Sequence, residues 1–146
     1  MINKTKNRDI VVGALKHAAP YIRMYKKKIF VIKAGGEVFE SHESTKKLVE
    51  QISILHQLGI RIVVVHGGGP QSTRLAEALG IETNMVDGRR VTSSETLKVS
   101  IMILNGEINT QILAACRELD VPAVGISGVD CGLINASKRA PVQMGD

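Results

Sequence analysis

The sequence predicts an α/β domain with a largely parallel sheet, and three observations lead to this fold class. Short apolar runs rich in β-branched residues alternate with segments whose apolar residues recur at helical spacing. Two of these runs end in glycine-rich turns. The run at residues 61–66 has no polar residue in its interior, which is typical of a strand that helices cover on both faces. Alternating strands and helices favour a layered α/β architecture.

The first 28 residues differ from the rest in charge and pattern. The net charge of the 146-residue chain is +5, and eight of its nineteen Lys and Arg residues lie in this segment beside a single acidic residue. Apolar residues from Val11 to Tyr25 recur at helical spacing. We therefore expect an amphipathic helix, kinked or broken at Pro20 because proline removes a helix hydrogen bond. It would pack on its own domain or against another copy, with a membrane-surface or presequence role as a further alternative.

Composition disfavours several classes of function. The body beyond residue 28 is mildly acidic and the whole chain has four aromatic residues, so it offers no stacking platform for nucleic acid. No apolar run reaches the ~18–20 residues that cross a bilayer. Cys116 and Cys131 show no C-x-x-C spacing, and the N-terminus lacks a signal-peptide pattern. We expect a cytoplasmic protein that binds neither nucleic acid nor membrane and has no metal site of its own.

Local signals set the expected elements beyond residue 28. A glycine just after a helix favours its C-terminal cap, an Asp-Gly pair favours a hairpin turn, and Thr-Ser-Ser-Glu favours a capping box. The expected elements are a strand at 29–34, a helix at 45–58 closed by Gly59, a strand at 61–66, a helix at 71–79 opened by Pro70 and ended by Gly80, a hairpin over 84–91 turning at Asp87-Gly88, a helix from a capping box at 92–95 to about Leu104, a helix at 109–119, and strands at 122–126 and 133–137.

Two glycine-rich turns are the main candidates for a binding site. Residues 33–36 read Lys-Ala-Gly-Gly, and residues 66–70 read His-Gly-Gly-Gly-Pro. Glycine lets the backbone approach a ligand, and N–H groups near a helix N-terminus favour anions. One such turn alone is an ordinary strand–helix connection, but two at the carboxyl ends of neighbouring strands indicate an anion site. Neither turn has the dinucleotide or P-loop spacing, which disfavours a hydride-transfer enzyme and a P-loop NTPase.

Two cationic residues accompany these turns. Lys33 ends an apolar strand directly before Gly35, so its ammonium either reaches solvent or meets a negative partner such as phosphate. Arg90 follows the predicted hairpin turn, where it is either a solvated charge or a planar fork that binds a carboxylate with two hydrogen bonds. The residues alone leave both pairs of alternatives open.

Five motifs, in this order and spacing, resemble the acetylglutamate kinases of the amino-acid kinase family. They lie at residues 31–36, 63–71, 86–92, 104–109 and 123–130, and the resemblance runs from residue 18 to residue 146. It implies a three-layer αβα sandwich and the ATP-dependent phosphorylation of the side-chain carboxylate of N-acetyl-L-glutamate in arginine biosynthesis. Members of the family are much longer than this chain. The resemblance therefore implies an N-terminal helical extension at 1–27 and, at 28–146, the N-terminal, amino-acid-binding half of the kinase domain.

The resemblance also implies partners and residue roles. ATP would be the co-substrate with Mg²⁺, and the helix at 1–27 is similar to that of the arginine-inhibited hexameric members, which implies L-arginine as an inhibitor and a homodimer or hexamer built through this helix. The implied roles are charge stabilisation on the transferring phosphoryl group for Lys33, ATP phosphate binding for Gly35 and Gly36, binding of the side-chain carboxylate of the substrate for Gly68 and Gly69, and binding of its α-carboxylate for Arg90.

Other functions stay open at this point. The chain also resembles the kinase-like, arginine-sensing domain of N-acetylglutamate synthases or of fused synthase–kinases. Those domains often lose the lysine and the three-glycine turn, and this chain keeps both at Lys33 and residues 67–69. A sister kinase acting on N-acetyl-aminoadipate is a further alternative. Sequence beyond Asp146 would discriminate a kinase from a synthase.

Overall fold

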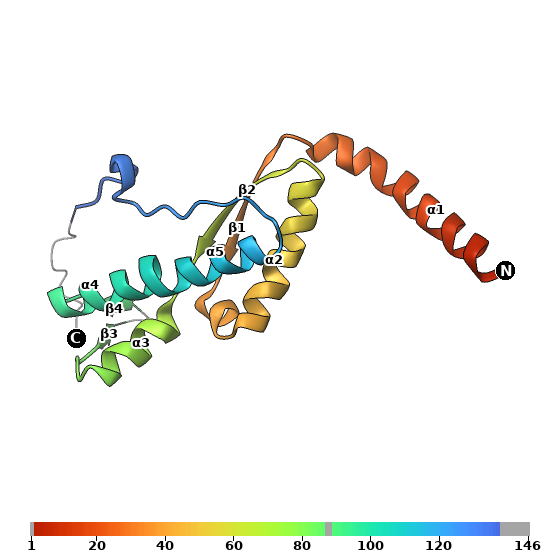
Figure 1. Cartoon of the computed structure of the whole chain (residues 1–146). Coiled ribbons are helices and arrows are strands. Elements are labelled where there is room, and N and C mark those ends of the chain that lie inside the picture. Colours follow the sequence, from red (N-terminus) through yellow and green to blue (C-terminus); the bar gives the residue numbers. More distant parts are fainter. Residues whose placement is uncertain (1, 87–88, 138–146) are drawn as a thin grey trace.

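A computed structural model describes residues 2–86 and 89–137, with the side chains of residues 2–6 and 89–90 outside that description (Figure 1). The elements in chain order are α1 (Ile2–Tyr25), β1 (Ile29–Ala34), the 3-10 turn η1 (Gly36–Phe39), α2 (His42–Gln57), β2 (Arg61–His66), α3 (Gly69–Ala78), β3 (Asn84–Val86), β4 (Arg89–Val91), α4 (Ser94–Ile101), the π-helix η2 (Met102–Ile108), α5 (Asn109–Glu118) and the 3-10 turn η3 (Asp130–Gly132). The mixture of helices with a parallel strand pair confirms the predicted α/β class.

The sheet that carries the glycine turns consists of β1 and β2, paired in parallel. Successive side chains of a strand point to opposite faces, and burial alternates accordingly along both strands. One face lies toward α2 and α5 (Figure 1). The other carries Val31, Val63 and Val65, which are 48–67% exposed, so within the described residues a helical layer covers only one side of the sheet.

Two adjoining apolar clusters form the core beneath the sheet. The first gathers residues from β1, η1 and η2, and the second joins α2 to α5 and the chain after it. Ile112 packs against both clusters and so connects them. The buried members are Ala34, Phe39, Ile103 and Ile108 in the first cluster and Val49, Ala115, Cys116 and Val121 in the second.

The helix over the core is continuous from Ser94 to Glu118, whereas the sequence predicted two helices, one ending at about Leu104 and the next beginning at Asn109. A π-helical stretch joins the two. In a regular α-helix, residues five apart, such as Ile103 and Ile108, point about 140° away from each other. The wider turn brings both into the core, and both are buried. By length and mean hydropathy this is the one helix of the described part that could span a membrane, and here it packs against α2 and α3.

Several local signals are confirmed and two are corrected. Gly59 and Gly80 lie just beyond their helices at φ +82° and +66°, in the left-handed region that glycine tolerates. The cap of α4 is Ser93, whose hydroxyl accepts a hydrogen bond from the Thr96 N–H at 3.2 Å, rather than Thr92. The helix α1 continues through Pro20 instead of breaking, because one lost hydrogen bond on an exposed helix leaves a carbonyl that water can reach.

The strands predicted at 122–126 and 133–137 are wrong. The first segment is an extended chain that lies over the free edge of β2 without pairing to it, and Val124 is 86% exposed. The Asn109 side chain stands against Gly125, where an added Cβ would overlap its amide. A strand needs a neighbour for its backbone hydrogen bonds, and these apolar residues find none within the described chain.

Candidate functional site

The two glycine-rich turns meet backbone against backbone at the carboxyl ends of β1 and β2. The Gly67 N–H donates to the Ala34 carbonyl at 2.9 Å and extends the strand ladder by one bond. A Cβ added to Gly36 would come within 3.1 Å of the Gly68 Cα, and one added to Gly67 within 3.3 Å of the Gly36 nitrogen. Side chains would not fit here, so the glycines let the turns approach closely.

The second turn leads directly into α3. Gly68 is the N-cap, Gly69 is the first residue of the helix and Pro70 follows it. The first N–H groups of a helix have no partner within it, and proline has none to offer. Gly68 is buried, whereas Gly69 is exposed and an added Cβ would meet open space. The exposed N-terminus of α3 at Gly69 therefore presents backbone donors and a positive dipole end, which suit a carboxylate.

Gln71 links this helix to the first turn, and the sequence analysis gave it no role. Its side chain is 4% exposed, and its Nε2 donates to the carbonyl oxygen of Gly36 at 2.7 Å. Its Oε1 is buried without a hydrogen-bond partner. The signal in the sequence was its place three residues after the N-cap, where a glutamine side chain can reach back over the helix start.

Lys33 lies one step before the first turn. It is exposed, it pairs in register with Val65, and it shares the uncovered sheet face with Val31. The structure thus places Lys33 at the end of the sheet that carries both turns. Glu37 follows the turn, and its carboxylate leans over Gly35, where an added Cβ would overlap it. A cation and an anion therefore flank the first glycine turn.

The hairpin that carries Arg90 is confirmed as an antiparallel pair, with Met85 opposite Arg90 in the register. It lies beside α3 and α4 (Figure 1). The turn residues Asp87 and Gly88 and the side chain of Arg90 lie outside the described residues. The assignment of Arg90 to a carboxylate therefore stays a prediction.

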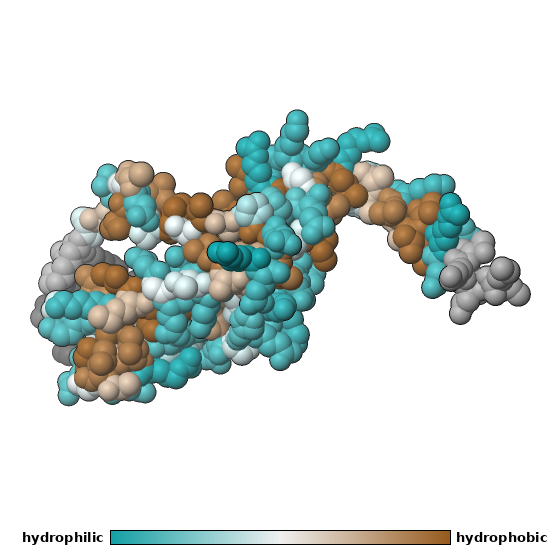
Figure 2. Space-filling model, in the orientation of Figure 1, coloured by the Kyte–Doolittle hydropathy of each residue, from teal (hydrophilic) through white to brown (hydrophobic). Residues whose placement is uncertain are grey.

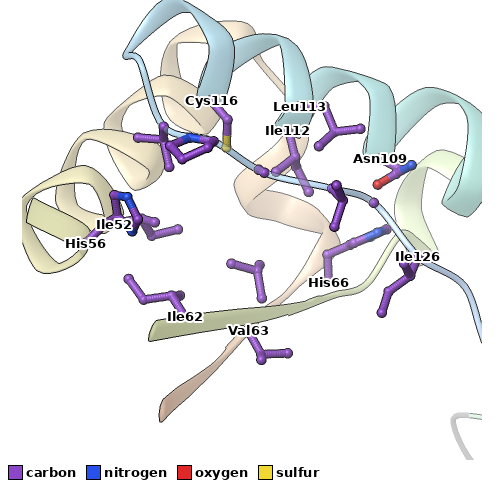
Figure 3. A pocket seen from close by; sticks show the side chains of 16 residues that line it. Ile52, His56, Ile62, Val63, His66, Asn109, Ile112, Leu113, Cys116 and Ile126 are labelled. Atoms are coloured by element: carbon purple, nitrogen blue, oxygen red, sulfur yellow. The ribbon is translucent and has the colours of Figure 1, made fainter. Parts of the chain in front are cut away.

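Two cavities lie between the end of β2 and the long helix. The first, of about 370 Å³, is lined by apolar side chains of α2, β2, α5 and the segment after it, as Figure 3 shows. Burial raises the pKa of the Cys116 thiol in its wall. The second, of about 310 Å³, is more polar. His66 and Asn109 line both.

Asp130 lies at the wall of the polar cavity and closes a local turn. Its carboxylate accepts hydrogen bonds from the backbone N–H of Ser127 and from the Ser127 hydroxyl, the latter at 3.0 Å. These bonds lower the pKa of Asp130. Within residues 2–86 and 89–137, no three His, Cys, Asp or Glu side chains come together in a way that could hold a metal ion.

Together these features suit an anionic ligand. Backbone donors at two adjoining turns can bind charged oxygens, and a lysine at their edge can stabilise charge that develops between them. The structure brings Lys33, Gly35, Gly36, Gly68 and Gly69 to one end of one sheet.

The chain is similar to known proteins over most of its length. The model of the amino acid kinase family matches residues 28–144. An acetylglutamate kinase of Myxococcus xanthus is 46% identical over 132 residues, which cover 90% of this chain and 43% of that protein. An acetylglutamate kinase of Zymomonas mobilis is 44% identical, with 85% and 41% covered. The chain thus spans less than half the length of these relatives.

Two solved structures share the fold. An N-acetylglutamate synthase from Neisseria gonorrhoeae, complexed with coenzyme A and N-acetyl-glutamate, aligns over 77% of this chain and 26% of its own with a TM-score of 0.65 and 33% identity. The same enzyme complexed with coenzyme A and L-arginine aligns over 89% and 27% with a TM-score of 0.60 and 30% identity. Because the family model spans residues 28–144 and the structure has the parallel α/β core, the chain belongs to the amino acid kinase family.

Proposed function

We propose that this chain is the N-terminal, amino-acid-binding half of an acetylglutamate kinase, with residues 1–27 as a helical extension and residues 28–146 as the kinase portion. The enzyme transfers the γ-phosphoryl group of MgATP to the side-chain carboxylate of N-acetyl-L-glutamate in arginine biosynthesis, in the cytoplasm. The observation that carries the proposal is the close approach of the Gly35-Gly36 turn to the Gly67–Gly69 turn, with Lys33 on the strand that leads into the first.

The proposed mechanism is positioning and electrostatic stabilisation. The amides of Gly35 and Gly36 face the ATP phosphates, and the start of α3 at Gly68 and Gly69 binds the side-chain carboxylate of the substrate. Arg90 holds its α-carboxylate. The Lys33 ammonium stabilises negative charge on the phosphoryl group during its transfer. Phosphoryl transfer needs little else from a protein, because holding two anions in line and neutralising their charge supplies most of the catalysis.

The rest of the kinase would complete the nucleotide site and the second helical layer. Parallel sheets are normally covered on both faces, and here Val31, Val63 and Val65 stay exposed on one face. The relatives are more than twice as long as the portion matched here. We place the remaining half over this face. Mg²⁺ would enter with the phosphates of ATP.

Ligand binding and turnover test the proposal together. Isothermal titration of the 146-residue chain should show binding of N-acetyl-L-glutamate and weaker binding of L-glutamate and N-acetyl-aminoadipate. A coupled ADP-release assay should show no turnover by the chain alone and turnover in the range of about 1–100 s⁻¹ for the complete polypeptide. Turnover in that range by the 146-residue chain would overturn the half-enzyme assignment. Tighter binding of N-acetyl-aminoadipate would assign the sister kinase instead.

A second candidate is the arginine-sensing, kinase-like domain of an N-acetylglutamate synthase. The likeness to the Neisseria gonorrhoeae synthase, solved with L-arginine in one of its complexes, favours it. A sensing domain would bind L-arginine and would not bind N-acetyl-L-glutamate at the glycine turns. Binding of both would indicate an arginine-inhibited kinase, and the coding sequence after Asp146 would show either the rest of a kinase or an acetyltransferase.

We also propose that α1 joins copies of the protein into a dimer or hexamer. The helix projects from the body (Figure 1), and Figure 2 shows hydrophobic residues along it beside hydrophilic ones. Its exposed apolar residues include Ile10, Val11 and Leu15. Light scattering should give an oligomer for the intact chain and a smaller species after deletion of residues 1–27. An unchanged mass after deletion would contradict the proposal.

A further inference from the structure

Gln71 connects the two glycine turns through its side chain. It lies on the first turn of α3, which follows one glycine turn, and its amide reaches the other turn 35 positions away in the sequence. A backbone carbonyl can only accept a hydrogen bond, so the amide nitrogen must face the Gly36 oxygen, at 2.7 Å. The bond is buried, which makes it stronger than the same bond in water.

This bond sets the plane of one peptide. In a planar trans peptide the C=O and the N–H point in opposite directions, and the described chain contains no cis bond. Holding the Gly36 carbonyl toward α3 therefore directs the N–H of Glu37 away from α3. A rotation of this peptide would move the Glu37 N–H, the donor that follows the two glycine amides, relative to the start of α3.

The side-chain amide of Gln71 packs tightly against Gly36. A Cβ on Gly36 would come within 2.8 Å of the Gln71 Oε1 and 3.0 Å of the Pro70 Cδ. The glutamine and the proline thus hold the Gly36 turn against the helix start from the side, while the hydrogen bond fixes its rotation. Within the described residues the Oε1 itself bonds to nothing, so the donor Nε2 is the atom that connects the turns.

We propose that Gln71 is a positioning residue for the phosphoryl transfer, setting the separation and orientation of the phosphate-binding turn relative to the carboxylate-binding turn. The inference rests on the function proposed above. It needs no contact between Gln71 and either substrate. A misplacement of about 1 Å between reacting groups can cost about a hundredfold in rate, so a buried side chain between the two turns can control the rate from outside the reacting centre.

The first test compares the hydrogen bonds of Gln71 and Arg74, two side chains of α3 that both reach the segment around η1. Gln71→Met keeps the length of the side chain and removes the donor. It removes the unpaired oxygen but also takes this donor away from the buried Gly36 carbonyl, so some loss of stability is expected beside any effect on the rate. Arg74→Met is the matched control: its guanidinium bonds Glu40 at 3.0 Å and also joins α3 to the end of η1, but at the exposed surface. In the complete kinase, Gln71→Met should lower kcat about tenfold or more, with each KM within about threefold. Arg74→Met should change neither.

The second test restores the donor by pH. Gln71→Glu places a carboxylate against the Gly36 carbonyl, where it cannot donate, and burial raises the pKa of such a group. Protonation would give an O–H that donates to the same oxygen. As the pH falls from 8 to 6, the kcat of Gln71→Glu should therefore rise relative to wild type, while the ratio for Gln71→Met stays flat. A side chain that only filled space would show no such recovery.

The outcomes separate this inference from the proposed function. A wild-type enzyme without kinase activity overturns both. An active wild type with normal kcat in Gln71→Met overturns the positioning role alone. If Gln71→Met has a lowered urea midpoint, the Gln71→Glu profile decides: recovery at low pH supports the role, and a flat profile overturns it.

Discussion

Gly68 lies directly against Ile108: a Cβ on the glycine would come within 2.7 Å of the isoleucine Cδ1. The same Cβ would stand 2.8 Å from the Leu104 Cδ2. The π-helical stretch of the long helix therefore packs on the N-cap of α3, and the end of the second glycine turn is part of the core as well as of the candidate site. A Cβ added to Gly69, the next residue, would meet only open space.

This difference gives a first prediction on stability. Gly68→Ala should lower the free energy of unfolding by about 1–3 kcal/mol, because an overfilled core must shift to accept a methyl group. Gly69→Ala should change it by no more than about 0.5 kcal/mol, because this exposed helical position accepts alanine. Urea denaturation followed by circular dichroism checks both. Equal losses for the two variants would contradict the packing of Gly68 against the π-helix.

A second prediction concerns the charge of Lys33. In the complete kinase, Lys33→Met keeps most of the side-chain stem and deletes the ammonium, so kcat should fall about 10²-fold or more, as for the loss of one preorganised electrostatic group. Steady-state kinetics with both substrates measures it. Arg61→Met is the control, since Arg61 is an exposed cation on the same sheet face at the opposite end of the strands. Near-normal kcat in Lys33→Met would mean that its ammonium only reaches solvent.

The third prediction concerns Arg90. A clamp on the α-carboxylate, remote from the reacting end, binds ground state and transition state alike and acts mainly on KM. Arg90→Ala should raise the KM for N-acetyl-L-glutamate. Arg90→Lys should raise it less, because a lysine keeps the charge but cannot form the two parallel hydrogen bonds of a guanidinium. The KM for ATP should stay constant. If Arg89→Ala is the more damaging change, the assignment belongs to the neighbouring residue.

The fourth prediction concerns Glu37, whose carboxylate leans over Gly35. Two anions about 4 Å apart repel by about 1 kcal/mol in water, so the carboxylate should oppose ATP phosphates at this turn. Glu37→Gln should lower the KM for ATP by up to about fivefold. The gain should shrink as salt screens exposed charges. Glu43→Gln, on the exposed start of α2, is the control. An unchanged KM for ATP would place the phosphates away from Gly35.

The fifth prediction concerns pH and the turn at residues 127–130. The bonds from Ser127 lower the pKa of Asp130 below its ordinary value of 3.8. A lowered folded-state pKa means that the stabilisation is present above pH 3.8 and is lost as the pH falls through the folded value. NMR titration of the carboxyl should give a pKa below the ordinary value of 3.8. Asp130→Asn should remove the pH dependence of the Ser127 amide shift, and a shift that still titrates would contradict the hydrogen bond.

The sequence by itself determined the local elements and the residue types of the site. Gly59 and Gly80 marked helix ends because only glycine adopts a left-handed backbone without strain. The spacing of apolar residues marked α2 because a helix must bury one face, and Pro70 marked the start of α3. The two glycine turns were visible for a similar reason, since a backbone that closely approaches another group excludes a Cβ.

Only the tertiary structure decided how these parts fit together. The strand predicted at 122–126 found no partner, since a strand is stable only when another backbone supplies its hydrogen bonds. The predicted gap between Leu104 and Asn109 is part of a π-helix, because burying both Ile103 and Ile108 favours an unbroken helix with a wide turn. Gln71 emerged as the link between the turns through a contact across 35 positions. Local patterns report what each segment can form, whereas contacts between distant segments depend on which surfaces meet.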